Sequence, residues 1–221
     1  MAGPTKTVGV PGAITHNNIK RILAFHIVSQ IGYMIMGLGL FSVAGLAGAV
    51  LYVIHHIVVK TTLFLIAGLV EFRAGTGDLD RIGGLARLEP VLAVLYLLPA
   101  LSLAGLPPFS GFVAKLALID AGLAVDQWGI VAVSLLVSLL TLFSVTKIWA
   151  NVFWEVPEVQ ESDMAERSTL AGRTLMVGAT GVLVVLSLAI AAGSGPLFEL
   201  STRAAEELVD PTPYREAVLR P

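Results

Sequence analysis

Ionisable side chains recur every four residues inside an otherwise apolar stretch of this sequence. Tyr52, His56 and Lys60 have this spacing within the segment 43–70. Residues four apart lie on one face of an α-helix, so the three groups are expected to form a single stripe. Such groups, within reach of one another through water, are suited to a proton relay. The alternative is that they only satisfy polar partners between packed helices.

Lys115 is the second candidate, because it follows a break in its own apolar segment, 90–122. The sequence Gly105-Leu-Pro-Pro-Phe-Ser-Gly111 interrupts that segment, and each proline removes a backbone amide donor. A broken helix leaves carbonyl and amide groups unpaired, which is tolerated at membrane depth only inside protein or beside water. An ionisable group at such a break is typical of ion sites in transporters. The alternative is a lysine that extends to the membrane surface.

Other polar residues are weaker candidates for the relay, namely His55, Tyr52 and His26. His26 begins a stripe at helical spacing that continues through Gln30 and Tyr33. This stripe is expected to face other helices, where it either hydrates a proton path or only forms interhelical hydrogen bonds. His55 and the histidine that follows it are a poor metal pair, because neighbouring residues on a helix point about 100° apart.

The segment 128–154 also carries polar residues, but these favour a structural interpretation. Ser134, Ser138 and Thr141 are interpreted as close-packing residues, and Lys147 as a side chain that extends to the membrane surface. The sequence contains no phosphate-binding loop, dinucleotide fingerprint or nucleophile elbow, and it has no cysteine. No cofactor and no metal site are therefore predicted.

The composition indicates that lipid surrounds the helices that position these residues. The 221 residues are 56% hydrophobic and 14% charged, with a mean hydropathy of +0.84, whereas soluble domains are roughly 25% charged. A lipid bilayer is therefore a predicted partner. The net charge of −2 gives no basic footprint, so no nucleic-acid partner is expected.

The apolar segments predict an all-α integral membrane protein with about five transmembrane helices. A span needs about 20 mostly apolar residues, and the predicted spans are about 22–41, 43–70, 90–122, 128–154 and 172–192, the third broken by Pro107-Pro108. We expect a transmembrane domain over 18–195, a cytoplasmic leader over 1–17, and an extracytoplasmic tail with an interfacial helix over 196–221.

Lysine and arginine residues indicate the orientation, since they are enriched in cytoplasmic loops. They occur in the leader, in the loop 71–89 and in the loop 155–171, whereas the connections near Ser42 and over 120–127 have none. The N-terminus is therefore predicted to be cytoplasmic and the C-terminus extracytoplasmic, in the plasma membrane of a bacterium.

Three ordered motifs resemble a known family. They are Asn18-Ile-Lys-Arg-Ile-Leu-Ala-Phe-His26 with Ser29-Gln-Ile-Gly-Tyr33, then His56-Ile-Val-Val-Lys60-Thr-Thr-Leu-Phe-Leu, and Gly105-Leu-Pro-Pro-Phe-Ser-Gly-Phe-Val-Ala-Lys115. These residues resemble the antiporter-like membrane subunits of respiratory complex I and of Mrp-type cation/proton antiporters. Within that family, Ile31-Gly-Tyr-Met-Ile-Met-Gly-Leu-Gly39 and Pro213-Tyr-Arg-Glu-Ala-Val-Leu219 look most like the Mrp antiporter branch.

The resemblance implies a fold of roughly fourteen helices in two inverted repeats, of which this chain resembles the C-terminal part. Lys115 matches the lysine of the second broken helix, and His56 and Lys60 match relay positions on the preceding helix. The first repeat and the helix preceding Asn18 are expected to be missing, since residues 1–15 do not resemble a span.

The predicted function is that of a subunit, or a fragment of one, of a multi-subunit antiporter that exchanges a monovalent cation, with sodium favoured, for protons. Its implied partners are the other subunits of that complex. One alternative is a proton-pumping membrane subunit of a complex I-like NADH:quinone oxidoreductase or membrane hydrogenase. Another is an assembly subunit that transports nothing. A secondary transporter is favoured over an enzyme.

Overall fold

A computed structural model describes residues 2–155 and 170–219 of the chain, and these are helical almost throughout. The helices are α1 (Ala2–Thr15), α2 (Ile19–Gly39), α3 (Val43–Ala74), η1 (Leu79–Arg81), α4 (Leu85–Leu88), α5 (Pro90–Ala104), α6 (Ser110–Ala124), α7 (Trp128–Trp149), the π-helical turn η2 (Ala150–Trp154), α9 (Leu170–Ala192), α10 (Ser194–Val209) and α11 (Thr212–Leu219). Most of the predicted loop 155–171 lies outside the described residues.

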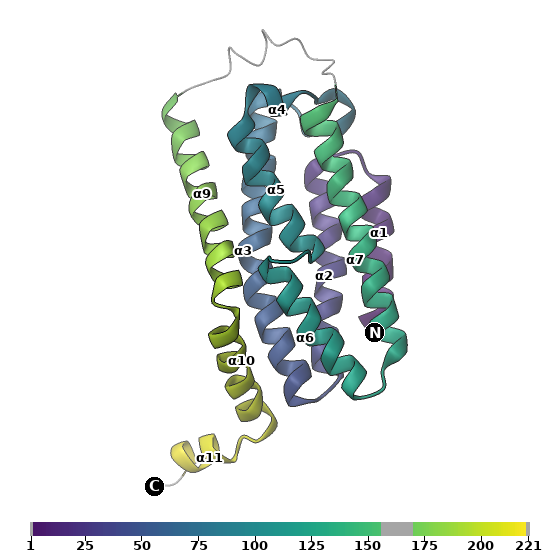
Figure 1. The fold of residues 1–221 in the computed structure, drawn as a ribbon, viewed down its shortest axis with the longest axis vertical. Coiled ribbons are helices and arrows are strands. Elements are labelled where there is room, and N and C mark those ends of the chain that lie inside the picture. The colour runs from purple at the N-terminus through teal and green to yellow at the C-terminus, as the bar shows by residue number, and fades with distance from the viewer. Residues whose placement is uncertain (1, 156–169, 220–221) are drawn as a thin grey trace.

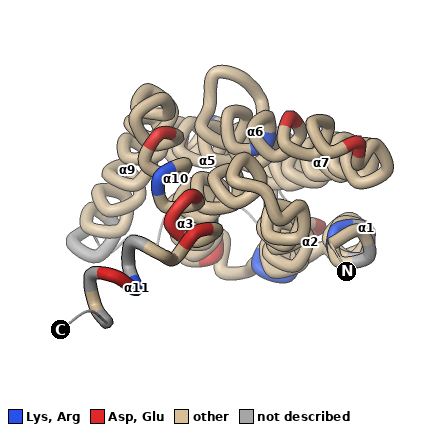
Figure 2. The backbone as a smooth tube through the Cα atoms, turned by 90° about the horizontal axis from the view of Figure 1, so that it is seen from below, with Lys and Arg blue, Asp and Glu red and all other residues tan. Residues whose placement is uncertain are grey.

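The long helices run side by side as a bundle (Figure 1). Helices α5 and α6 follow one another along the bundle and together match the length of one long helix. Seen along the bundle in Figure 2, α1 and α9 lie at opposite edges, and charged residues occupy small patches on a mostly uncharged tube. The surfaces of these helices therefore suit lipid or neighbouring subunits.

Four helices in the described residues are long and apolar enough to cross a membrane. They cover Ile19–Gly39, Val43–Ala74, Trp128–Trp154 and Thr174–Ala192, and α5 is a shorter apolar helix. Together with the α5–α6 pair, they correspond to the five predicted segments. The predicted fold class, an all-α membrane protein with a broken third segment, is confirmed.

The break between α5 and α6 begins at Gly105. Its φ of +90° is in the left-handed region, where glycine has no steric penalty. The Gly105 amide donates to the carbonyls of Leu101 and Ser102, which ends α5. Pro107 and Pro108 follow, and α6 begins shortly after them, at Ser110. The chain therefore stops one helix and restarts another in the middle of the bundle.

The N-terminal segment differs from the expected leader. Residues 2–15 form α1, which packs along α2 and also contacts α7. Glycines allow the close approach, since a Cβ on Gly9 would lie 2.6 Å from the Ser29 amide nitrogen and one on Gly12 would meet the Phe25 ring. A helix therefore precedes Asn18, where the sequence predicted none. Glycines, prolines and one lysine interrupt its apolar residues, so the sequence shows no long apolar run there.

The C-terminal segment is helical, and its predicted place outside the cytoplasm stays a prediction. Helix α10 follows α9 almost directly and packs against α3, with Ser201 and Ala205 buried. Phe198 joins a small apolar cluster with Leu46 and Ala47 of α3. Among the described helices, α11 is the one that lies apart from the bundle (Figure 1). Before it, hydrogen bonds from Thr212 hold the pKa of the Asp210 carboxyl below its ordinary value.

One end of the bundle is joined by polar contacts. The Leu79 amide donates to the Asn17 carbonyl at 2.7 Å, and Arg73 pairs with Glu89 at 2.7 Å. Lys20 pairs with Glu71 nearby. The first contact joins the α1–α2 connection to the loop after α3, and the two ion pairs join α3 to the start of α5 and to α2.

Candidate functional site

Lys115 lies inside the bundle at the helix break. Its side chain is buried, and its Nζ donates to the carbonyls of Leu103 and Ala104, both at 2.9 Å. These carbonyls end α5 and have no helical amide to pair with. The C-terminus of a helix also carries partial negative charge, which favours a cation. The break therefore supplies the partner that a buried ammonium needs.

Two stacked tyrosines connect Lys115 to the α3 stripe. The Lys115 ammonium lies 5.1 Å from the centroid of the Tyr33 ring, and that ring stacks on Tyr52 at 5.3 Å. Tyr52 in turn stacks on His56, with 6.3 Å between centroids. The structure thus brings Lys115 and the predicted stripe together through two aromatic rings of α2 and α3.

The rest of the stripe is buried as its spacing requires. Lys60 lies one turn beyond His56, and its Nζ donates to the Leu23 carbonyl of α2 at 2.9 Å. Tyr52 donates a hydrogen bond to Gln30, also of α2. The stripe therefore runs along α2. Lys60 and Lys115 both bond backbone carbonyls, and no salt bridge within residues 2–155 and 170–219 involves either of them.

His55 faces a different neighbour from His56. Its Nδ1 lies 2.8 Å from the Ser110 hydroxyl at the start of α6, and that hydroxyl lies 3.2 Å from Ser102 at the end of α5. His55 thus lies where the two halves of the broken helix meet. Both imidazoles also contact the Tyr52 ring, His55 edge-on with 5.6 Å between centroids and His56 stacked at 6.3 Å.

Helices α2 and α7 form a ladder of polar contacts, of which the sequence indicated the α2 side but not the α7 partners. His26 Nε2 lies 2.9 Å from the Ser144 hydroxyl, Gln30 donates to Thr141 at 3.4 Å, and the Tyr33 hydroxyl lies 2.8 Å from Ser138. The interpretation of the α7 hydroxyls as close-packing residues is therefore incomplete. Their spacing of three and four residues was the signal, because it places them on one helix face.

Lys147 was expected to extend to the membrane surface, and the structure shows its ammonium at the polar end of the bundle, bound to the end of α1. Its Nζ donates to the carbonyls of Ile14 and His16 at 3.0 and 3.1 Å and to Asn17 Oδ1 at 2.8 Å. These acceptors lie at and after the C-terminal end of α1. Lys147 therefore satisfies helix-end carbonyls that lack amide partners.

Three buried histidine nitrogens have no hydrogen-bond partner among the described residues. They are Nδ1 of His26, Nε2 of His55 and Nε2 of His56. Buried polar atoms are nearly always paired with protein or ordered water. All three belong to the polar layer, which we define as His26, Tyr33, Tyr52, His55, His56, Lys60 and Lys115. These nitrogens are available to bond water or a moving proton.

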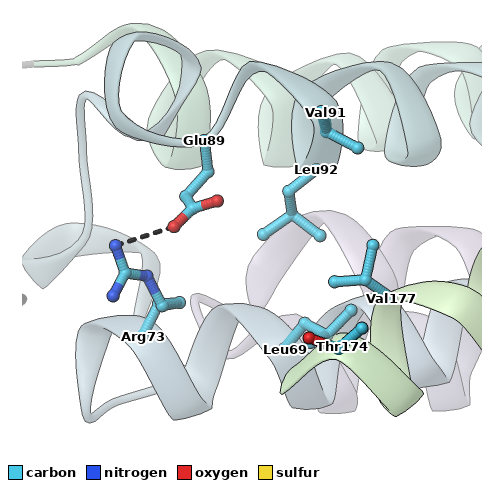
Figure 3. Close-up of a pocket in the computed structure, with 7 residues that line it drawn as sticks. All are labelled: Leu69, Arg73, Glu89, Val91, Leu92, Thr174 and Val177. Carbon is cyan, nitrogen blue, oxygen red and sulfur yellow. Dashed lines mark ion pairs between the residues drawn. The ribbon is translucent and has the colours of Figure 1, made fainter. Parts of the chain in front are cut away.

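A separate cavity lies away from this polar layer. It has a volume of 240 Å³ between the end of α3, the start of α5 and α9, and it is lined by Leu69, Arg73, Glu89, Val91, Leu92, Thr174 and Val177. Figure 3 shows the Arg73–Glu89 ion pair at one side of the cavity and apolar side chains at the other. The relay candidates do not line it, so we assign it a structural role.

A membrane bundle with a lysine bound at a helix break is an arrangement found in ion transporters. The sequence pattern of the family described as NADH:quinone oxidoreductase/Mrp antiporter, TM matches residues 5–141, and the chain belongs to this family. The chain is 42% identical over 220 residues to a Na(+)/H(+) antiporter subunit of Alkalihalophilus pseudofirmus. That match covers 100% of this chain and 44% of the relative.

Solved structures agree with this assignment. One chain of the Mrp complex from Dietzia sp. DQ12-45-1b is 38% identical, with a TM-score of 0.89 over 99% of this chain and 48% of the other. A chain of respiratory complex I from Thermus thermophilus with bound NADH is 26% identical, with a TM-score of 0.78 over 93% of this chain and 43% of the other. The predicted resemblance is confirmed, and the chain spans less than half the length of these relatives.

Proposed function

We propose that this chain forms the part of a multi-subunit monovalent cation/proton antiporter in which Lys115 takes up and releases a proton. The observation that carries the proposal is the buried Lys115 ammonium on the free carbonyls of α5. Sodium is the favoured cation, because the relatives are named as Na(+)/H(+) antiporter subunits. The other subunits of such a complex are the proposed partners, in the plasma membrane of a bacterium.

The contacts at the helix break link the charge of Lys115 to the position of its side chain. A protonated ammonium is held by the carbonyls of Leu103 and Ala104, whereas a neutral amine is held less strongly because charge-assisted hydrogen bonds are the stronger ones. The released proton passes toward His56 and Lys60 through water at the unpaired histidine nitrogens. Neighbouring groups respond to the change, since low dielectric strengthens Coulomb interactions.

The test is Lys115→Ala in the assembled transporter. Inside-out membrane vesicles from a host without its own Na⁺/H⁺ antiporters report cation-driven proton flux, and the amount of complex in the membrane reports assembly. We expect flux to be lost while assembly is retained. The matched control is Lys20→Ala, whose exposed ammonium pairs with Glu71 at the end of the bundle. Normal antiport by the Lys115 variant would overturn the proposal.

A redox-driven proton pump is the second candidate, favoured by the likeness to a chain of complex I. The same buried residues serve either function, and the driving reaction is what differs. The subunits that copurify with this chain distinguish the two functions. Flavoprotein or iron–sulfur subunits indicate the pump, whereas a complex of further membrane subunits without them indicates the antiporter. A subunit needed only for assembly would show flux that does not depend on Lys115.

We further propose that the end of the bundle with Lys20, Arg21 and Arg81 faces the cytoplasm, because loops rich in lysine and arginine stay on that side. The chain has no cysteine, so single-cysteine variants report accessibility. We expect Arg81→Cys to react with an impermeant thiol reagent only from the cytoplasmic side. Phe41→Cys, at the opposite end and 80% exposed, should react only from outside. The reverse pattern would invert the orientation.

A further inference from the structure

A third lysine, Lys6 of α1, is buried in the same layer although no relay role was predicted for it. Its side chain is fully buried between α2 and α7. The Lys6 Nζ lies 2.5 Å from the Ser134 hydroxyl, 3.1 Å from the Met36 sulfur and 3.8 Å from the centroid of the Tyr33 ring. The ammonium thus contacts groups from two helices, neither of them its own.

Helix α2 leaves room for this side chain. A Cβ at Gly32 would collide with Cγ of Lys6, so glycine opens the passage that the lysine stem uses. The Lys6 carbonyl accepts a hydrogen bond from Ser29 at 3.3 Å, which fixes the backbone of α1 against α2. The position of Lys6 is therefore determined by small residues of α2.

Lys6 and Lys115 share one aromatic neighbour. Their ammonium nitrogens lie 3.8 Å and 5.1 Å from the same Tyr33 centroid, so they are separated by no more than the sum of these two distances. The Tyr33 hydroxyl donates to the Ser134 carbonyl at 2.5 Å, and the Ser134 hydroxyl bonds Lys6. Polar groups are therefore continuous from the ring to Lys6.

The described surroundings of Lys6 contain positive charge and no acidic partner. The groups that face it are Tyr33 and Met36 from α2, Ser134 from α7, and Lys115 from α6 beside the shared ring. Neither salt bridge of the described residues involves Lys6. Two ammonium groups this close repel one another in a low-dielectric interior. The arrangement therefore favours one charge on the pair over two.

We propose that Lys6 and Lys115 form a paired-lysine site around Tyr33, in which a single proton is held by one lysine or the other. When the proton moves from Lys115 to Lys6, Lys115 changes from –NH₃⁺ to –NH₂ and Lys6 from –NH₂ to –NH₃⁺, so the proton is conserved and no other bond changes. The proton returns to Lys115 before it is released toward His56 and Lys60. Lys6 is then a further proton-carrying residue of the transport reaction. This inference rests on the proposed function, since it needs Lys115 to exchange its proton.

The test compares the pH profiles of cation-driven proton flux for variants of the assembled transporter. In Lys6→Met the neighbouring charge is gone, so Lys115 keeps its proton to higher pH. We expect the profile to shift by about one pH unit in the alkaline direction, from the Coulomb interaction of two charges at this range. Lys6→Arg keeps a charge that is never released, and we expect flux to fall by about tenfold or more.

Lys20→Met is the control, because it also removes a lysine charge but at the end of the bundle. A profile of Lys6→Met that matches Lys20→Met overturns the inference, as does wild-type flux in Lys6→Arg. A lower amount of complex with an unshifted profile means a structural role and overturns it too. If the Met variant does not assemble, Lys6→Gln, which can still donate to Ser134, should show the same alkaline shift. In each of these cases Lys115→Ala still loses flux, so the proposed function stands. If Lys115→Ala kept normal flux, the proposed function itself would be overturned.

Discussion

Lys115 and Lys147 bind similar partners in different surroundings. Each donates to backbone carbonyls at the C-terminal end of a helix, Lys115 at α5 and Lys147 at α1. Lys115 is buried beside the Tyr33 ring, whereas Lys147 is half-buried and also bonds the Asn17 side chain. The bond type is therefore the same. The comparison teaches that the two lysines differ in burial and neighbours and not in their carbonyl contacts, so any difference in their proposed roles must come from burial and neighbours.

The largest expected effect comes from Lys115→Arg. Arginine keeps a positive charge and can still donate to the carbonyls of Leu103 and Ala104, but it does not lose its proton at ordinary pH. We expect proton flux in vesicles to fall by about 100-fold or more, with the thermal stability of the complex nearly unchanged. Lys147→Arg is the matched control and should retain flux. Equal flux in the two arginine variants would mean that Lys115, too, serves only the helix end.

Gly105→Ala should have the next largest effect, because it disturbs both the break and the lysine. A side chain at φ +90° is strained by about 1–2 kcal/mol, and the added Cβ would lie 2.7 Å from Cδ of Lys115. We expect a lower unfolding temperature and flux reduced by about tenfold, since a small misplacement of a reacting group is costly.

Gly75→Ala separates these two causes. Gly75 ends α3 with φ +74°, so alanine there is strained in the same way, but this glycine lies at the end of the bundle. We expect similar destabilisation with normal flux. If both alanine variants lose flux equally, backbone strain alone explains the effect, and the contact with Lys115 has no special importance.

Lys147→Met should change stability and leave transport intact. The variant removes donors to the carbonyls of Ile14 and His16 and to Asn17, which we expect to cost about 1–2 kcal/mol. Hydrogen exchange of the backbone around residues 14–18 should rise, and flux per assembled complex should stay within about twofold. A loss of flux without faster exchange would place Lys147 in the proton path after all.

The sequence predicts the helix break and the α3 stripe well, because both follow from local rules. Prolines and glycines around Pro107 end a helix wherever they stand, and the four-residue spacing of Tyr52, His56 and Lys60 fixes a common face. The structure finds all three buried, although their role in proton transfer stays a prediction. These features need no knowledge of which helices are neighbours.

The features that the sequence did not predict depend on contacts between helices, and no single segment of the sequence specifies those contacts. Helix α1 has no long apolar run, and it packs in the bundle through its glycines against α2 and through the buried Val10 and Ala13. The role of the α7 hydroxyls becomes clear only with α2 opposite them. Lys6 belongs to the predicted leader, yet a gap at Gly32 admits it to the interior. In each case the deciding partner lies on another helix, beyond the reach of local sequence rules.

Lys20→Met is the smallest expected effect and sets the scale for the others. The Lys20 side chain is 48% exposed and that of Glu71 26%, so water and salt screen their ion pair. Such pairs contribute about 0–1 kcal/mol. We expect an unfolding temperature close to that of the unaltered complex, with any difference vanishing at high salt, and flux equal at every pH. A large loss of flux in this variant would show that removing any lysine from the chain impairs transport, and the contrast between Lys115 and Lys147 would then lose its meaning.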